Sequence, residues 1–302
     1  MDQPTIGLAL GGGGARGFAH IGALQVLHEE NIPISFVAGT SMGAIVGAMY
    51  AESLDPFTVE RKFREFVQTD TYREMNLEQV ISKIDKDANF WDYITSEIRG
   101  HLVLQMARNR ISLLKSDPLV HLLEALLTIE TFEQCKIPFV AVATDLITGQ
   151  DEVLRSGKLL LAVQASASIP GYLPPITIDE QMLCDGGITC PVPVKYAKES
   201  SVDLVIGIAV PPQIDAPRPL GHAVDLLSRA EQITSYYYSN TLMAEADIEI
   251  FPKTGAVQWN EFNQMTEMIQ AGREATKSVI PAIREIIRQQ IPWWQLLLQR
   301  IT

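Results

Sequence analysis

The chain has 302 residues, 47% of them hydrophobic and 20% charged, a composition typical of a globular protein and not of a disordered one. Its formal net charge of −12 disfavours binding to nucleic acid and to strongly anionic lipid surfaces. Three cysteines without a C-x-x-C pair predict neither a disulfide framework nor a zinc site, and they favour a reducing, cytoplasmic location. We also expect no cofactor, no secretory signal and no membrane-spanning segment.

Apolar runs alternate with helical spacings along most of the chain. In chain order the sequence predicts a strand at 6–10, a helix at 15–30, a strand at 36–38, helices at 42–53, 57–67 and 119–128, strands at 138–145 and 151–154, a helix at 159–168, strands at 182–184 and 204–210, and helices over most of the chain from 222 onward.

This alternation predicts an α/β fold, a three-layer sandwich in which helices cover both faces of a mostly parallel central sheet. No repeat or linker divides the chain, so we expect one domain. It would consist of a core over residues 5–210 and a mostly helical C-terminal part over 211–302. Residues 70–116 have helix-like apolar spacing and are expected to form a helical insertion, either a lid or a structural element.

A glycine-rich loop, Gly11–Gly17, separates the first strand from the first helix. Its G-x-G-x-x-G spacing is typical of dinucleotide sites, but these need an acidic residue at the end of the second strand, where this chain has Val37-Ala38-Gly39. A loop that merely turns the chain is a second interpretation. A third is an oxyanion hole, whose backbone donors stabilise a tetrahedral anion by about 3 kcal/mol each. Arg16 would add charge there or pair with a carboxylate as a structural cap.

A G-x-S-x-G turn, Gly39-Thr40-Ser41-Met42-Gly43, follows the second strand. Such a strand-to-helix turn projects the serine hydroxyl clear of its neighbours, and the two glycines let the backbone pass closely. The sequence therefore favours Ser41 as a nucleophile, with an ordinary helix cap as the alternative.

A nucleophilic serine needs a base, and this chain offers aspartates at strand ends more readily than histidines. Asp185 with His222 would complete the Ser-Asp-His order of α/β-hydrolases, but a lone histidine is more often a surface or core residue. Asp185 stands before Gly186-Gly187, while the competing Asp145 also suits a turn-initiating role. We favour Asp185, because small and rigid residues over 162–176 suit the shaping of a site.

Together these motifs resemble the patatin-like phospholipases, in the bacterial branch that is similar to the catalytic domain of neuropathy target esterase. The resemblance covers about residues 5–210 and rests on Gly12-Gly13-Gly14-Ala15-Arg16-Gly17, Gly39-Thr40-Ser41-Met42-Gly43, Ala165-Ser166-Ala167-Ser168-Ile169-Pro170 and Asp185-Gly186-Gly187. It implies a patatin-like fold and a dyad of Ser41 and Asp185 without histidine. It also implies acyl-lipid esters as substrates and an oxyanion hole at Gly12, Gly13, Gly14 and Arg16.

The end of the chain reverses the overall charge, because five basic side chains stand against two acidic ones from residue 273 onward. An apolar helical stripe from Ile283 to Ile301 includes Trp293-Trp294, side chains that favour a membrane interface. A helix docked on the domain explains such a stripe. The alternative is peripheral contact with the inner face of a membrane through an interfacial tail at 291–302.

The sequence therefore predicts a serine lipid acyl hydrolase of the phospholipase or lysophospholipase type. A catalytically silent lipid-binding or regulatory protein of the same fold is one alternative, which the intact Ser41, Asp185 and glycine loop disfavour. A nucleotide-binding protein is another, which the missing acidic residue disfavours.

Overall fold

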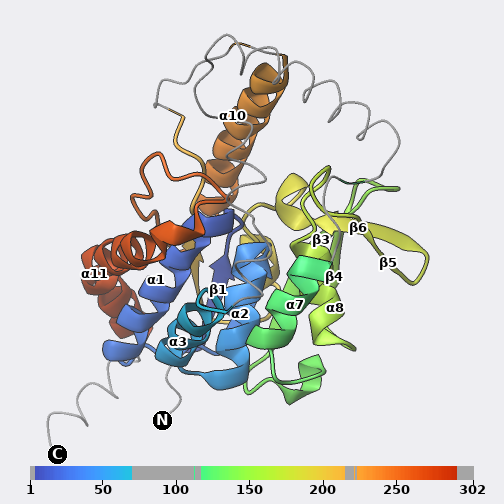
Figure 1. Ribbon diagram of the computed structural model, residues 1–302. Helices are drawn as coiled ribbons and strands as arrows, with labels where there is room; N and C mark the ends of the chain where they lie inside the picture. Colours follow the sequence, from blue (N-terminus) through green and yellow to red (C-terminus); the bar gives the residue numbers. More distant parts are fainter. Residues whose placement is uncertain (1–3, 70–111, 113–116, 215–220, 222, 291–302) are drawn as a thin grey trace, which may run out of the picture.

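The computed structural model describes residues 4–69, 112, 117–214, 221 and 223–290 (Figure 1). The helical insertion expected at 70–116 lies almost entirely outside these residues. His222 and the tail expected at 291–302 lie outside them as well.

The described strands form one sheet. They are β1 Ile6–Leu10, β2 Phe36–Thr40, β3 Phe139–Asp145, β4 Asp151–Leu154, β5 Ile176–Ile178, β6 Gln181–Asp185, β7 Leu204–Ile208 and β8 Ile248–Ile250. They pair in the order β5-β6-β3-β2-β1-β7-β8, and β4 also pairs with β3. The pairs among β1, β2, β3, β7 and β8 are parallel, whereas β4, β5 and β6 join in antiparallel. The predicted fold class, α/β with a mostly parallel sheet, is confirmed.

The described helices are α1 Phe18–Glu29, α2 Met42–Ser53, α3 Pro56–Phe66, α7 Asp117–Leu126, α8 Leu159–Ser166, α9 Val194–Lys198, α10 Ala223–Met243 and α11 Met265–Gln290. Short 3₁₀ helices are η1 Gly14–Gly17, η2 Phe132–Gln134, η3 Gly186–Ile188 and η4 Phe262–Gln264. Residues 18–27 of α1 and 42–51 of α2 are all buried, so both helices lie inside the protein and have no solvent face over these residues. By contrast, α3 buries one face only.

Helices cover both faces of the sheet (Figure 1). On one face, Leu8 of β1 and Val37 of β2 share a core cluster with α1, α2, α3, α7, α8 and α11. On the other, Ala9 and Ala38 pack with Val194 of α9 and the last residue of α10. Neighbouring strand residues point to opposite faces, so each strand contributes to both clusters. The result is the predicted three-layer arrangement.

The ladder of β3 brings the ends of β2 and β6 together. Residues 141 and 142 of β3 pair with both β2 and β4, so these two strands lie on opposite edges of β3. Residues 143 and 144 pair with both β4 and β6, which places β6 on the same edge as β2. Thr40 is opposite Val142, and Asp185 is opposite the next residue, Ala143. The residue after Thr40 therefore lies beside Asp185.

Helix α11 docks on α1 along the outside of the core. A Cβ on Gly22 would lie 1.9 Å from Ile269 O, and one on Gly272 would lie 1.9 Å from Ala19 O, so the two backbones are in contact. Arg273 of α11 also pairs with Glu29 of α1 at 2.9 Å. In the described part of the C-terminal stripe, Ile283 is fully buried, and Ile286 and Ile287 pack against the core. Up to Gln290, the stripe thus faces the protein.

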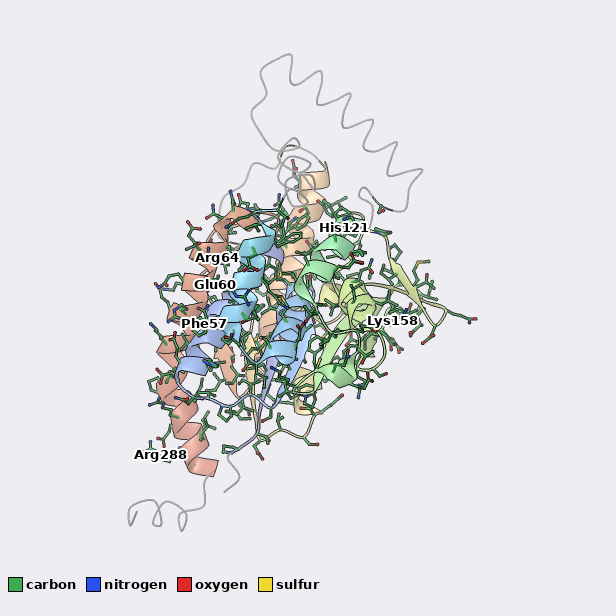
Figure 2. The ribbon with its side chains drawn as sticks, turned by 60° about the horizontal axis from the view of Figure 1, so that its bottom comes forward. Phe57, Glu60, Arg64, His121, Lys158 and Arg288 are labelled. Carbon is green, nitrogen blue, oxygen red and sulfur yellow. The ribbon has the colours of Figure 1, made fainter. Side chains whose placement is uncertain are left out.

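Side chains of α3 and α11 lie on the outside of the helical layer. Figure 2 shows Phe57, Glu60 and Arg64 along α3, and Arg288 near the end of α11. The Glu60–Arg64 pair, 2.7 Å apart, is a helical i, i+4 contact on the partly exposed face of α3.

Most of the predicted elements are present, and short ones were missed. The strands β5 and β8 and the helix α9 have three to five residues each, too few for periodicity to identify them. β2 continues beyond the predicted Ala38 to Thr40, because Gly39 and Thr40 complete the ladder with β3.

Candidate active site

Ser41 occupies the turn between β2 and α2, with φ 55° and ψ −123°. A positive φ is uncommon for a residue other than glycine, and such strain concentrates at functional turns. The Ser41 side chain makes no helix-capping hydrogen bond, so the capping alternative is wrong. The flanking glycines permit close packing: a Cβ on Gly39 would lie 2.5 Å from Ala44 Cα, and one on Gly43 would lie 2.1 Å from Leu10 O.

Asp185 ends β6 and is buried, with 7% of its surface exposed. Its Oδ1 accepts a hydrogen bond from Gly187 N–H at 2.8 Å, and its own N–H donates to Ser168 O at 2.9 Å. Burial raises the pKa of Asp185 from 3.8 to about 6, although hydrogen bonds from Ser41 and Gly187 oppose the rise. The Asp185 carboxyl group therefore keeps its proton to a higher pH than an ordinary aspartate does.

Ser41 follows Thr40 and lies beside Asp185 on the β3 ladder, and its side chain is close enough to the carboxyl group to lower the pKa of Asp185. Close contact between β3 and the start of η3, directly after Asp185, requires glycine, because a Cβ on Gly186 would lie 2.2 Å from Val142 O. The backbone of Ser41 is also fixed, because its N–H donates to Ser166 Oγ at 3.0 Å. The two side chains are therefore held together by three segments that are distant in the sequence.

The glycine loop passes directly beside Ser41, as a Cβ on Gly12 would lie 3.2 Å from Ser41 Cβ. The Gly12 N–H donates to Pro191 O at 2.9 Å, so this amide is already engaged. The N–H groups of Gly13 and Gly14 have no hydrogen-bond partner among the described residues. Gly14 has a φ of +56°, which a residue with a side chain rarely adopts. Of the glycines expected to form an oxyanion hole, Gly13 and Gly14 have amides available.

Arg16 is buried and holds the loop in place. Its Nε donates to Val210 O at 3.0 Å, and its Nη1 donates to Val257 O at 3.2 Å. The next residue, Gly17, allows η1 to pack on α2, since a Cβ there would lie 2.3 Å from Met42 Cγ. The side chain of Arg16 thus joins the loop to the backbone that follows β7 and β8, through carbonyl oxygens and not through the carboxylate that the structural alternative expected.

The competing aspartate has a structural environment. Asp145 Oδ1 accepts from Ile147 N–H at 3.0 Å, and Oδ2 accepts from Thr148 Oγ1 at 2.8 Å. These hydrogen bonds lower the pKa of Asp145, the opposite of the change at Asp185. Asp145 initiates the turn between β3 and β4, as its alternative interpretation predicts.

The described histidines do not contact Ser41 or Asp185 through any hydrogen bond. His20 is fully buried, its Nε2 lies 2.7 Å from Gly11 O, and burial lowers its pKa to about 4. His28 and His121 are exposed on α1 and α7. His222, the histidine of the triad alternative, lies outside the described residues.

The two acidic residues at the end of the first helix are engaged in ion pairs. Glu29 and Glu30, at the end of α1 that is remote from the glycine loop, pair with Arg273 and Arg284 of α11. In the part of the chain that the structure describes, no group of three or more His, Cys, Asp or Glu side chains could hold a metal ion. Nor does any helix of that part have the length and apolarity to cross a membrane.

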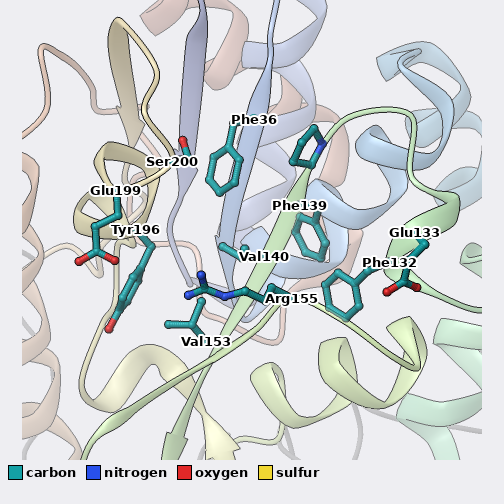
Figure 3. A pocket seen from close by; sticks show the side chains of 11 residues that line it. Phe36, Phe132, Glu133, Phe139, Val140, Val153, Arg155, Tyr196, Glu199 and Ser200 are labelled. Atoms are coloured by element: carbon teal, nitrogen blue, oxygen red, sulfur yellow. The ribbon is translucent and has the colours of Figure 1, made fainter.

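A cavity of about 370 Å³ lies apart from Ser41. Its lining includes Phe36, Phe139 and Val140 of the sheet, with Tyr196 of α9 and Arg155 (Figure 3). Phe36 and Phe139 are the first residues of β2 and β3, whereas Ser41 follows the last residue of β2. The cavity is thus at the opposite end of these parallel strands and is not part of the candidate active site.

Sequence reasoning missed the residues that support the site. Ser166 and Ser168 stood in a motif that was noticed, but nothing in the sequence indicated that one holds the Ser41 backbone and the other the Asp185 backbone. The Trp259 carbonyl accepts from Ala15 N–H at 2.7 Å, and no motif marks that segment. Glu231, on α10, raises the pKa of Asp185 through its charge and was also missed.

Comparisons with known proteins identify relatives of this chain. A family model described as patatin-like phospholipase matches residues 8–198. An uncharacterized NTE family protein of Mycobacterium tuberculosis is 31% identical over 209 residues, which cover 69% of this chain and 50% of that protein. Patatin-like phospholipase domain-containing protein 6 of Homo sapiens is 31% identical over 208 residues, which cover 68% of this chain and 13% of that protein. The chain therefore spans half or less of the length of these curated relatives.

Among solved structures, human GIVD cytosolic phospholipase A2 is similar, with a TM-score of 0.52 and 11% sequence identity. The similarity covers 94% of this chain and 60% of that one, and at this identity it concerns the fold alone. The family model, by contrast, matches more than half of the chain by sequence. The chain belongs to the patatin-like phospholipase family.

Proposed function

We propose that this protein is a serine lipid acyl hydrolase that cleaves carboxylic esters of lipids. Ser41 is the nucleophile, Asp185 the general base, and the amides of Gly13 and Gly14 the oxyanion donors. The observation that carries the proposal is the position of Ser41, on a strained turn, beside the buried carboxyl group of Asp185, whose pKa burial raises to about 6. Family membership supports lipid ester hydrolysis as the reaction class.

In the proposed reaction, Ser41 Oγ attacks the ester carbonyl carbon while Asp185 takes the hydroxyl proton. The carbonyl oxygen becomes an oxyanion that the two glycine amides stabilise. The tetrahedral intermediate then collapses, the C–O bond to the alcohol breaks, and Asp185 returns the proton to the leaving oxygen. Water, deprotonated by Asp185, attacks the acyl-enzyme and releases the fatty acid, which restores the Ser41 hydroxyl.

The raised pKa of Asp185 supports its role as a base without histidine. A carboxylate with the usual pKa is a weak base toward an alcohol, and burial makes Asp185 a stronger one. The remaining barrier is lowered by fixed amide donors, each of which contributes about 3 kcal/mol in enzymes of this kind. Both effects depend on the contacts that hold the three segments together.

An active-site probe and ester substrates test the proposal. A fluorophosphonate should label the wild type at Ser41, and p-nitrophenyl esters and phospholipid vesicles should be hydrolysed. The Ser41→Ala variant should lose both properties, while Ser168→Ala, another buried serine, should keep them. Labelled protein without turnover would favour the silent lipid-binding alternative. Absence of labelling, together with thermal stabilisation by nucleotides, would favour the nucleotide-binding alternative.

We further propose that residues 291–302 make a peripheral membrane contact that brings the site to its substrate. The Trp293-Trp294 pair supports this, because tryptophan favours the membrane interface. A chain that ends at Ile291 should bind zwitterionic vesicles more weakly in a flotation assay, with soluble-ester turnover unchanged. Equal flotation of the two proteins would refute the contact.

A further inference from the structure

Trp259 lies against the glycine loop from a segment outside the family match, in the connection between β8 and α11. Its carbonyl accepts from Ala15 N–H at 2.7 Å. A Cβ on Gly14 would lie 2.2 Å from the same carbonyl oxygen. The backbone of Trp259 is therefore packed directly on the loop that carries the two available amides.

Tyr172 belongs to the segment that holds the base. It follows Pro170-Gly171, and its N–H donates to Ile169 O at 3.1 Å. The residue before Ile169 is Ser168, whose carbonyl accepts the N–H of Asp185. Tyr172 thus stands a few residues from the backbone contact that fixes Asp185.

The rings of these two residues meet, with centroids 4.9 Å apart at an angle of 68°. We call Tyr172 and Trp259 the aromatic pair. Both residues are half-buried, so neither is sealed inside the core. Burial raises the pKa of both Tyr172 and Asp185, and the charge of Glu231 adds to each rise, so the tyrosine and the base lie near the same glutamate.

The aromatic pair therefore bridges the oxyanion side and the base side of the site. Resting on the hydrolase function proposed above, we infer that the pair is a wall of the acyl-chain subsite and sets the chain-length preference. A partly exposed apolar wall at this place offers burial to a hydrocarbon chain, and each buried methylene favours the complex. A short acyl group does not extend far enough to gain from that wall. The C-terminal part of the chain thus contributes specificity to a site whose reacting groups lie in the family-matched part.

Hydrolysis of p-nitrophenyl decanoate and butyrate tests this inference. Each buried methylene is worth about fourfold in binding, so Tyr172→Ala and Trp259→Ala should each lower the decanoate-to-butyrate ratio of kcat/KM at least about tenfold. Trp259→Phe should restore most of the ratio, because it keeps an aromatic ring. The double alanine variant should resemble the single ones, because both remove one shared wall. Phe57→Ala, a partly exposed phenylalanine on α3, serves as the matched control.

A second readout is independent of turnover. On the Ser41→Ala background, calorimetry should give tighter binding for decanoate than for butyrate, and Trp259→Ala should remove that difference. If the alanine variants lower kcat/KM equally for the two esters, or leave both values unchanged, the decanoate-to-butyrate ratio stays constant. That result would overturn the inference and show that the aromatic pair is purely structural. If wild-type protein neither hydrolyses esters nor reacts with a fluorophosphonate, the proposed function fails, and the binding comparison alone then decides on the subsite.

Discussion

Ser41 N–H donates a hydrogen bond to Ser166 Oγ at 3.0 Å, across 125 positions of sequence. The same hydroxyl donates to Val142 O at 2.6 Å and is fully buried. Ser166 thus ties the strained turn of the nucleophile to β3, the strand that also pairs with β6 and Asp185. One buried hydroxyl consequently links the nucleophile, the central strand and the helix α8.

Replacing Ser166 with alanine should leave the Ser41 amide and the Val142 carbonyl without their partner. A buried polar group without a hydrogen bond costs about 1–3 kcal/mol, so stability should fall by an amount of that order in denaturant unfolding. We also expect kcat to fall by tenfold or more, because the turn loses its anchor. Ser168→Ala is the matched control: among the described residues its hydroxyl bonds to Gln164 O alone, and its own carbonyl still accepts from Asp185. Equal kcat values for the two variants would show that the anchor has no catalytic consequence.

Asp185→Asn should abolish ester hydrolysis, because the amide cannot take the Ser41 proton. The same change should stabilise the fold at neutral pH. The folded pKa of about 6 exceeds the unfolded value near 3.8, so the folded state binds more protons between these values. Stability due to this group is therefore present below pH 4 and is lost as the pH rises through 6, by about 3 kcal/mol.

Urea unfolding at pH 4 and pH 7.5 measures the difference between this variant and the wild type. We expect Asp185→Asn to be more stable at pH 7.5 and nearly equal at pH 4. A variant that is less stable at pH 7.5 would mean that the Gly187 contact outweighs the burial of the charge.

Much of the fold could be predicted because the parallel strands are buried on both faces. Their sequences are therefore short apolar runs, which predict strands. Leu204–Ile208 and Phe139–Asp145 are such runs, and both are strands. The strands β5 and β8 could not be predicted, because three residues give no period and their pairing depends on distant partners. The central helices α1 and α2 were predicted, at 15–30 and 42–53, although they are buried all round and their amphipathic signal is weak.

The candidate site could be predicted in part from its glycines, because each stands at a position where the backbone leaves no space for a side chain. Gly39, Gly43 and Gly186 stand where a Cβ would meet backbone atoms at 2.5 Å or less. The engagement of Gly12 by Pro191 could not be predicted, since that contact joins segments separated by most of the chain. The same is true of Trp259 and Ala15. Contacts of this kind follow from the assembled sheet and leave no local pattern.

The pH dependence of hydrolysis should report the Asp185 carboxyl group. Since the carboxylate is the active form, kcat/KM should rise through pH 6 and then level off. The charge of Glu231 contributes to the raised pKa, so Glu231→Gln should lower the pKa of Asp185 and move the acidic limb to lower pH. The profile of Glu124→Gln, an exposed glutamate on α7, should match the wild type. An unmoved limb in Glu231→Gln would exclude this coupling.

The contact between α1 and α11 should be sensitive to a single methyl group. Alanine is about 1 kcal/mol better than glycine inside a helix, so Gly272→Ala would stabilise an unpacked helix. Here the new Cβ would lie 1.9 Å from Ala19 O, and backbone must move to accommodate it. Such overpacking costs about 1–3 kcal/mol, so we expect a net loss of stability and a melting temperature several degrees lower.

Because α1 follows η1 directly, the glycine loop should shift with it, and kcat should fall as well. Thermal unfolding and ester turnover measure both effects, with Lys277→Ala on the exposed side of α11 as the control. A gain in stability for Gly272→Ala would mean that the two helices separate easily and that α11 does not hold the loop.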